Sequence, residues 1–288
     1  TSTDSSVPTV RAGEGTAMRM LAITRKDLRT ARRSKGVWAT TVLFVLWFAG
    51  IAFALARFAE PDFDAFLDVT STIVALLGPL VGIVFGYRAV VGERESGTIA
   101  LLLSLPHSRR DAVLGKLLAR LLVLSGAMSV GALAGLVVLV AQYPSFEVGH
   151  YLAFVLAALA YVLVFVSLAT ALSTGLRSSR RVVGAAFGGY VALVMLWASL
   201  VDVLVVFLFR FRAGALADLP LWAESAKFLN PRATFSYLLS ETLDIGAGPA
   251  IAVDAQWFAS PVVALLVLTA WLIVPPVLGY LRFTAGEL

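Results

Sequence analysis

Residues 151–176 read YLAFVLAALAYVLVFVSLATALSTGL and contain no charged side chain. An α-helix rises about 1.5 Å per residue, so about 20 consecutive apolar residues are needed to cross the hydrocarbon core of a bilayer. Lipid offers the backbone no hydrogen-bond partner, and a spanning segment therefore satisfies its own amide groups by forming a helix. This stretch predicts a transmembrane α-helix.

Five further apolar runs have a similar length. They cover residues 37–56, 69–91, 117–141, 182–209 and 258–281. Over the whole chain 59% of residues are hydrophobic and only 14% are charged, whereas about a quarter of the residues of a soluble domain are charged. The sequence therefore predicts an all-α membrane protein with six transmembrane helices. The Pro275-Pro276 pair is expected to kink or break the sixth helix near its end.

Charged residues are divided unequally between the two sides of the membrane that six spans define. The side that holds both termini and the loops 92–116 and 177–181 carries 18 basic and 7 acidic residues, and the other side carries 5 basic and 11 acidic residues. Short loops rich in Lys and Arg stay in the cytoplasm. We therefore expect a multi-pass protein of the cell (cytoplasmic) membrane with both termini cytoplasmic. The asymmetry also explains the basic pI without a nucleic-acid partner.

The segments outside the spans follow their own patterns. Residues 1–17 are polar and predict a disordered N-terminal tail. Residues 18–35 place apolar side chains on one helical face among basic ones, which is typical of an amphipathic helix at the membrane surface. The transmembrane domain then covers residues 36–288. Between spans five and six, amphipathic stretches separated by Pro and Gly predict short helices on the outer leaflet; whether residues 213–256 re-enter the bilayer stays open.

The loop between spans two and three is the most charged of the cytoplasmic loops. Residues 93–98 read ERESGT, residues 101–106 read LLLSLP, and residues 108–110 read SRR. Residues 97–105 predict a short helix with one strongly apolar face. Such a face needs cover, either from the membrane surface or from a partner protein.

This loop resembles the first cytoplasmic loop of ABC-2 type transporter permeases, in particular the six-span group that includes the permease of nitrous-oxide-reductase maturation. The basic helix before span one and the Leu229-Asn230-Pro231 motif agree with the same family. The resemblance implies that residues 97–105 form a coupling helix, which contacts a separate nucleotide-binding ATPase subunit. The residues implied in this contact are Glu93, Arg94, Glu95, Ser96, Gly97, Thr98, Ile99, Leu102, Leu105, Pro106, Arg109 and Arg110.

The same resemblance implies the rest of the assembly. ATP and Mg²⁺ are expected on the partner ATPase, because this chain lacks the Gly-x-x-x-x-Gly-Lys-Ser/Thr phosphate loop. The permease is expected to pair with a second copy or a paralogue within membrane lipid, and export is the expected direction of transport. Glycines at four-residue spacing fit either close packing inside one chain or a dimer seam; they lie at 78/82/86, 131/135 and 184/188.

A membrane-embedded enzyme and a secondary carrier that works without an ATPase are the alternative functions. The sequence contains no cysteine, and its two histidines lie in different loops, so it offers no evident catalytic, cofactor-binding or metal-ligating cluster. Polar side chains at membrane depth are scarce. Asp202, Ser199 and Ser129 are candidates for a translocation path, although Asp202 fits a structural ion pair as well.

Overall fold

The computed structural model describes residues 34–95, 109–212, 214, 216, 219–245 and 259–285. Its regular elements over these residues are all helical, and they are α2 (Lys35–Val45), η1 (Leu46–Gly50), α3 (Ile51–Phe58), α4 (Phe63–Gly86), α5 (Val91–Glu95), α7 (Arg109–Gln142), α8 (Val148–Gly175), α9 (Ser179–Tyr190), η2 (Val191–Leu196), α10 (Trp197–Leu208), α11 (Leu221–Phe228), α12 (Pro231–Leu243) and α13 (Pro261–Ala285). The two η segments are π-helical turns inside longer helices. The predicted tail at 1–17, nearly all of the amphipathic helix at 18–35 and the coupling helix at 97–105 lie outside the described residues.

Among the described residues, six helices are long and apolar enough to cross a membrane, as the sequence predicts. Their bounds are Lys35–Phe58, Phe63–Gly86, Val113–Gln142, Val148–Gly175, Ser179–Leu208 and Pro261–Arg282. The second begins earlier than the hydropathy suggests, because the Asp62 carboxylate accepts a hydrogen bond from the backbone N–H of Asp64 at 3.1 Å and caps the helix. It also ends earlier, at Gly86, and a turn at residues 87–90 leads into α5.

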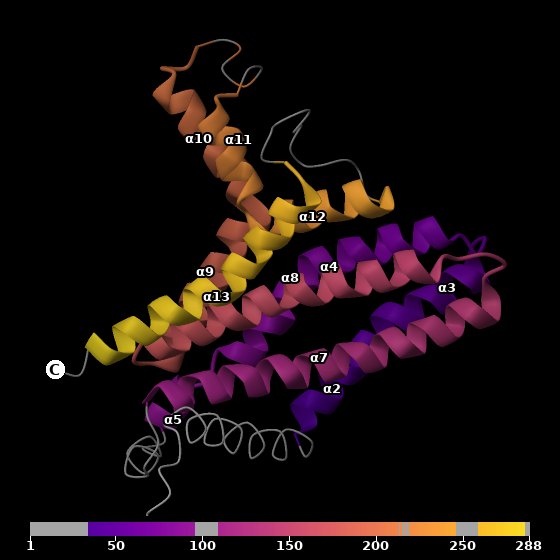
Figure 1. The fold of residues 1–288 in the computed structure, drawn as a ribbon, viewed down its shortest axis with the longest axis horizontal. Helices are drawn as coiled ribbons and strands as arrows, with labels where there is room; N and C mark the ends of the chain where they lie inside the picture. Colours follow the sequence, from indigo (N-terminus) through magenta and orange to yellow (C-terminus); the bar gives the residue numbers. More distant parts are fainter. Residues whose placement is uncertain are drawn as a thin grey trace, which may run out of the picture.

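Helix α8 lies at the centre of the bundle, where it contacts α4, α7, α12 and α13 (Figure 1). Its seam with α4 depends on glycine. A Cβ atom on Gly82 would lie 2.7 Å from the Val162 carbonyl oxygen, and one on Gly86 would lie 2.6 Å from the Val166 carbonyl oxygen. The two backbones can approach this closely only without side chains, which is how small residues pack helices in lipid.

The other glycine pairs differ in what they face. Gly131 and Gly135 on α7 pack against Phe44 and Phe48 of the first span, with hypothetical Cβ distances of 2.6 and 2.8 Å. By contrast, no heavy atom of the described chain lies within 4 Å of a Cβ built on Gly184 or Gly188. The first two sets therefore pack inside the chain, and only the pair at 184/188 has an open face.

At two prolines inside spanning helices, a hydroxyl group of α8 replaces the hydrogen-bond donor that the proline lacks. A proline lacks the N–H that would bond to the carbonyl four residues earlier. Opposite Pro79, the Tyr161 hydroxyl donates to the freed Ala75 carbonyl at 2.9 Å. Opposite Pro276, the Ser167 hydroxyl donates to the freed Leu272 carbonyl.

Of the expected kink or break at the Pro275-Pro276 pair, the break does not occur. Helix α13 runs through both prolines and ends at Ala285. The hydroxyl of Ser167 replaces the missing helical donor at Leu272, so that carbonyl is not left unpaired in the bundle interior. A sequence pattern cannot reveal this compensation, because the donor lies on a different helix.

Candidate functional site

One end of the bundle gathers α5, the C-terminal end of α8 and the N-terminal end of α9; we call it the loop end. The Ser173 hydroxyl oxygen of α8 accepts hydrogen bonds from the backbone N–H groups of Val90 and Val91, each at 3.0 Å. These are amides at the start of α5, where the chain has just left α4. Val90, Val91 and Ser173 are all buried. The start of the loop is therefore fixed to the bundle rather than free in solvent.

Glu95 joins the last turn of α5 to the first turn of α9. Its carboxylate accepts one hydrogen bond from the Ser179 backbone N–H and another from the Ser179 hydroxyl, both at 2.6 Å. The first satisfies an amide that the start of a helix leaves unpaired. Together these bonds hold the pKa of the Glu95 carboxyl below its usual value, with a smaller contribution from the positive charge of Arg88. Glu95 thus couples the loop to the fifth span.

A second candidate site lies near the middle of the spanning helices. Helix α11 returns along α10 toward the centre of the bundle, where α12 begins and packs against α8, α13 and α4 (Figure 1). Phe235 of α12 stacks on Tyr161 at a ring-centroid distance of 4.5 Å. Tyr161 lies close to the middle of α8. Helix α12 therefore reaches half-way into the bundle and packs among the spans at this point, whereas α11 packs along α10.

The π-helical turn η2 supplies backbone acceptors to this region. A π-turn widens the helix and leaves carbonyls without their usual donors. The Asn230 side-chain amide donates to the Leu193 carbonyl at 2.8 Å, and the Arg232 guanidinium donates to the Val194 carbonyl. The Asn230 side-chain oxygen also caps α12 by accepting from the Arg232 and Ala233 amides at 2.9 and 3.2 Å. Asn230 thereby locks α12 onto the fifth span.

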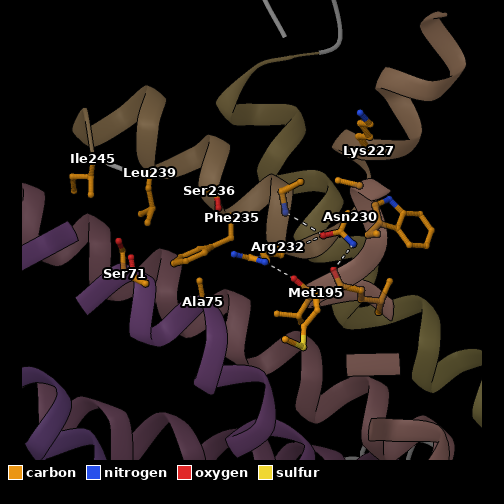
Figure 2. Close-up of a pocket in the computed structure, with 16 residues that line it drawn as sticks. Ser71, Ala75, Met195, Lys227, Asn230, Arg232, Phe235, Ser236, Leu239 and Ile245 are labelled. Carbon is orange, nitrogen blue, oxygen red and sulfur yellow. Dashed lines mark hydrogen bonds between the residues drawn. The ribbon is translucent and has the colours of Figure 1, made fainter. Parts of the chain in front are cut away.

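These elements line a partly open cavity of about 310 Å³. It is bounded by α4, η2, α10, α11 and α12, and Figure 2 shows Arg232 pointing into the space between Phe235, Ala75 and Met195. The polar lining includes the hydroxyls of Ser71 and Ser236 and the cations of Lys227 and Arg232.

Lys227 of α11 forms an ion pair with Asp202 of α10, with an Nζ–Oδ1 distance of 2.5 Å. The Lys227 side chain is only 10% exposed and that of Asp202 is 33% exposed. The structure thus gives Asp202 the structural ion pair that the sequence allowed. The partner is Lys227 rather than the arginines at the end of the same span, because α11 folds back antiparallel along α10 (Figure 1).

Comparison with known proteins agrees with this architecture. A family model described as ABC-2 family transporter protein matches residues 21–288. The chain belongs to the ABC-2 transporter family. Two relatives are named probable ABC transporter permease protein NosY. The Pseudomonas aeruginosa protein is 32% identical over 183 residues, which cover 61% of this chain and 66% of the relative. The Stutzerimonas stutzeri protein is 32% identical over 113 residues, which cover 38% and 41%. Each match spans less than two thirds of the relative.

Only part of the ATPase contact predicted for this ABC-2 protein lies in the described residues. Glu93, Arg94 and Glu95 belong to α5, and Arg109 and Arg110 are the first two residues of α7. The basic residues at the end of this loop are therefore already helical. The remaining predicted contact residues, Ser96, Gly97, Thr98, Ile99, Leu102, Leu105 and Pro106, fall outside the described residues.

The three candidate path residues do not form one site. Ser199 and Asp202 lie a turn apart on α10, and Ser129 is exposed on α7. Helices α7 and α10 lie on opposite sides of α8 (Figure 1). The sequence missed Asn230 and Arg232 as interior residues, because a loop that contains Asn, Pro and Arg is normally placed at the surface. The available signal was the Asn230-Pro231 pair, which is a typical helix start.

Proposed function

We propose that this chain is the membrane-spanning permease subunit of an ATP-driven transporter, that it works as an exporter, and that it is coupled to a separate ATPase through residues 97–105. The family membership supports the permease assignment, and the relatives named as ABC transporter permeases point the same way. ATP and Mg²⁺ would bind to the ATPase. Both termini would lie in the cytoplasm, as the charge asymmetry requires.

The observation that carries the proposal is the attachment of the loop at its start. Ser173 holds the amides of Val90 and Val91, and Glu95 holds Ser179. A partner that pushes or pulls on residues 97–105 would therefore act directly on α8 and α9. A flexible attachment would absorb the same displacement without moving a span.

Deletion of residues 97–106 tests the coupling. We expect the deletion variant to insert in the membrane and to lose co-purification with the ATPase. Deletion of the equally long segment 246–255, which the charge pattern places on the opposite side, is the control and should leave ATPase binding intact. Full ATPase binding by the 97–106 variant would exclude the proposed contact. Ion-gradient-driven counterflow by the chain alone, in liposomes without ATPase, would favour a secondary carrier instead.

A second copy or a paralogue would pack on the open face of α9. No described residue lies within 4 Å of a Cβ built on Gly184 or Gly188, and Val183 and Phe187 beside them are exposed. In lipid, such small residues let two helices approach closely. Cysteine introduced at Gly188 should form a disulfide between copies or with the paralogue, whereas cysteine at Gly126, which also faces open space, should not. Equal cross-linking at both positions would exclude this seam.

A further inference from the structure

Arg232 is a cation placed deep inside the bundle beside a cavity. Its neighbours Ala75, Tyr161 and Val194 each lie near the middle of a spanning helix. At about 1.5 Å per residue, this level is about 18–22 Å from the helix ends. Charged side chains at such depth are rare because they lose their hydration, and they pair with a counter-charge or line a functional site.

The charge of Arg232 has no carboxylate partner within 4.0 Å among the described residues, whereas the neighbouring Lys227 is paired with Asp202. The described contact of the guanidinium is a hydrogen bond to the Val194 carbonyl. A guanidinium carries five N–H donors, so this bond leaves most of them to be satisfied. Arg232 is half-buried and lines the cavity, which places the remaining donors beside empty space.

The rest of the lining indicates the kind of ligand that fits. The Ser236 hydroxyl adds a hydrogen-bond donor to the lining, whereas the Ser71 hydroxyl already donates to the Asp68 carbonyl at 2.8 Å. Leu239 and Ile245 provide an apolar wall (Figure 2). A volume of about 310 Å³ lies at the low end of small-molecule sites, which start near 300 Å³. The cavity therefore suits a single oxyanion group with a short apolar attachment, not a whole drug-sized molecule.

We propose that this cavity is a binding site for a phosphate-type oxyanion, held by the Arg232 guanidinium with help from the Ser236 hydroxyl. Arginine matches the geometry of a phosphate with two parallel hydrogen bonds, which are stronger than bonds between neutral groups. The oxyanion could come from the headgroup of an anionic phospholipid or from free phosphate. Binding requires neither ATPase nor ATP, so this inference stands apart from the proposed transport function.

The test measures lipid binding by the full chain purified in detergent. Phosphatidylglycerol, phosphatidylcholine and inorganic phosphate are titrated separately, and occupancy is read by native mass spectrometry together with the thermal unfolding temperature. We expect phosphatidylglycerol to bind to the wild type more tightly than phosphatidylcholine. The substitution Arg232→Gln should weaken that binding about tenfold or more, the loss expected for a charge-assisted hydrogen bond. Arg232→Lys should retain part of it.

The matched control is Arg57→Gln, which removes an exposed arginine at the end of the first span and should leave binding unchanged. Ser236→Leu keeps Arg232 but fills the cavity, and it should weaken binding in the same way. If Arg232→Gln does not fold, the Ser236→Leu variant decides the question. If inorganic phosphate raises the thermal unfolding temperature as much as phosphatidylglycerol does, and only when Arg232 is present, that result would identify free oxyanion as the ligand. Lipid binding that is unchanged by Arg232→Gln, or unchanged by Ser236→Leu, would overturn the proposal.

Discussion

The carboxylate of Glu95 accepts two hydrogen bonds from Ser179, one from its backbone N–H and one from its hydroxyl, both at 2.6 Å. The two residues lie far apart in the sequence, and their contact ties the end of α5 to the start of α9. It links the fifth span, which also packs against α4, α8, α11 and α12, to the start of the loop between the second and third spans.

Replacing Glu95 with Ala should loosen the start of α9. The Ser179 amide loses its acceptor, so hydrogen exchange in a peptide covering residues 176–183 should increase several-fold, measured by mass spectrometry. The substitution Glu60→Ala removes an exposed carboxylate from a loop and should leave this exchange unchanged. Unchanged exchange in the Glu95 variant would show that the contact does not hold α9.

The same contact should weaken in acid. The hydrogen bonds from Ser179 lower the pKa of Glu95, so the ionised form is the one that the folded state stabilises. A carboxyl with a lowered folded pKa contributes stability above its unfolded pKa and loses it as the pH falls through the folded value. Exchange at residues 176–183, corrected for the intrinsic pH effect, should therefore be constant near neutral pH and rise below the ordinary Glu value of about 4.3. The Glu95→Gln variant should not show this rise.

Tyr161 and Pro79 should be energetically coupled. Removing the Tyr161 hydroxyl leaves the buried Ala75 carbonyl unpaired, and Tyr161→Phe should cost about 1–3 kcal/mol of unfolding free energy. Pro79→Ala restores the helical N–H that bonds to Ala75, so Tyr161→Phe should cost less in that background. Denaturant unfolding in a double-mutant cycle measures the coupling. Tyr143→Phe, which removes a hydroxyl bonded to Ala52, should show no coupling to Pro79.

The seam between α4 and α8 should not accept a side chain. Gly86→Ala would bring a methyl group within 2.6 Å of the Val166 carbonyl and 2.7 Å of the Ala169 Cβ. Overpacking of this kind costs about 1–3 kcal/mol, and the thermal unfolding temperature should fall accordingly. Gly126→Ala adds the same methyl group where no atom lies within 4 Å, and it should have no such effect. Equal unfolding temperatures for the two variants would contradict the observed packing.

The effects of replacing Lys227 and Asp202 on the free energy of unfolding should not be additive, because the two side chains form one ion pair. Lys227→Met leaves a half-buried carboxylate without its partner, and we expect a loss of about 1–3 kcal/mol, between the values for exposed and buried pairs. The double variant Lys227→Met with Asp202→Asn removes both charges and should recover most of that loss. Denaturant unfolding of the three proteins measures this. A double variant that is less stable than Lys227→Met alone would indicate a role for Asp202 beyond the pair.

Much of the membrane architecture could be predicted because it depends on local composition. Apolar length alone specifies a spanning helix, since lipid leaves the backbone no other means of satisfying its amide groups. The six spans and the helical class followed from this rule, and the family resemblance followed from the motif at residues 93–110. The boundaries were less accurate where capping decides them, as at Asp62.

Residues 219–245 were harder to place, because their position depends on contacts with other helices. Asn230 and Arg232 read as surface residues by type, and they lie inside the bundle only because the π-turn η2 offers the carbonyls of Leu193 and Val194 as partners. The sequence by itself determined which helices are long and apolar enough to cross the membrane, because hydropathy is a property of each segment alone. Only the tertiary structure decided which groups bond to the carbonyls that Pro79 and Pro276 leave free and which carbonyl accepts from Arg232. These partners belong to other helices, so no local pattern reveals them.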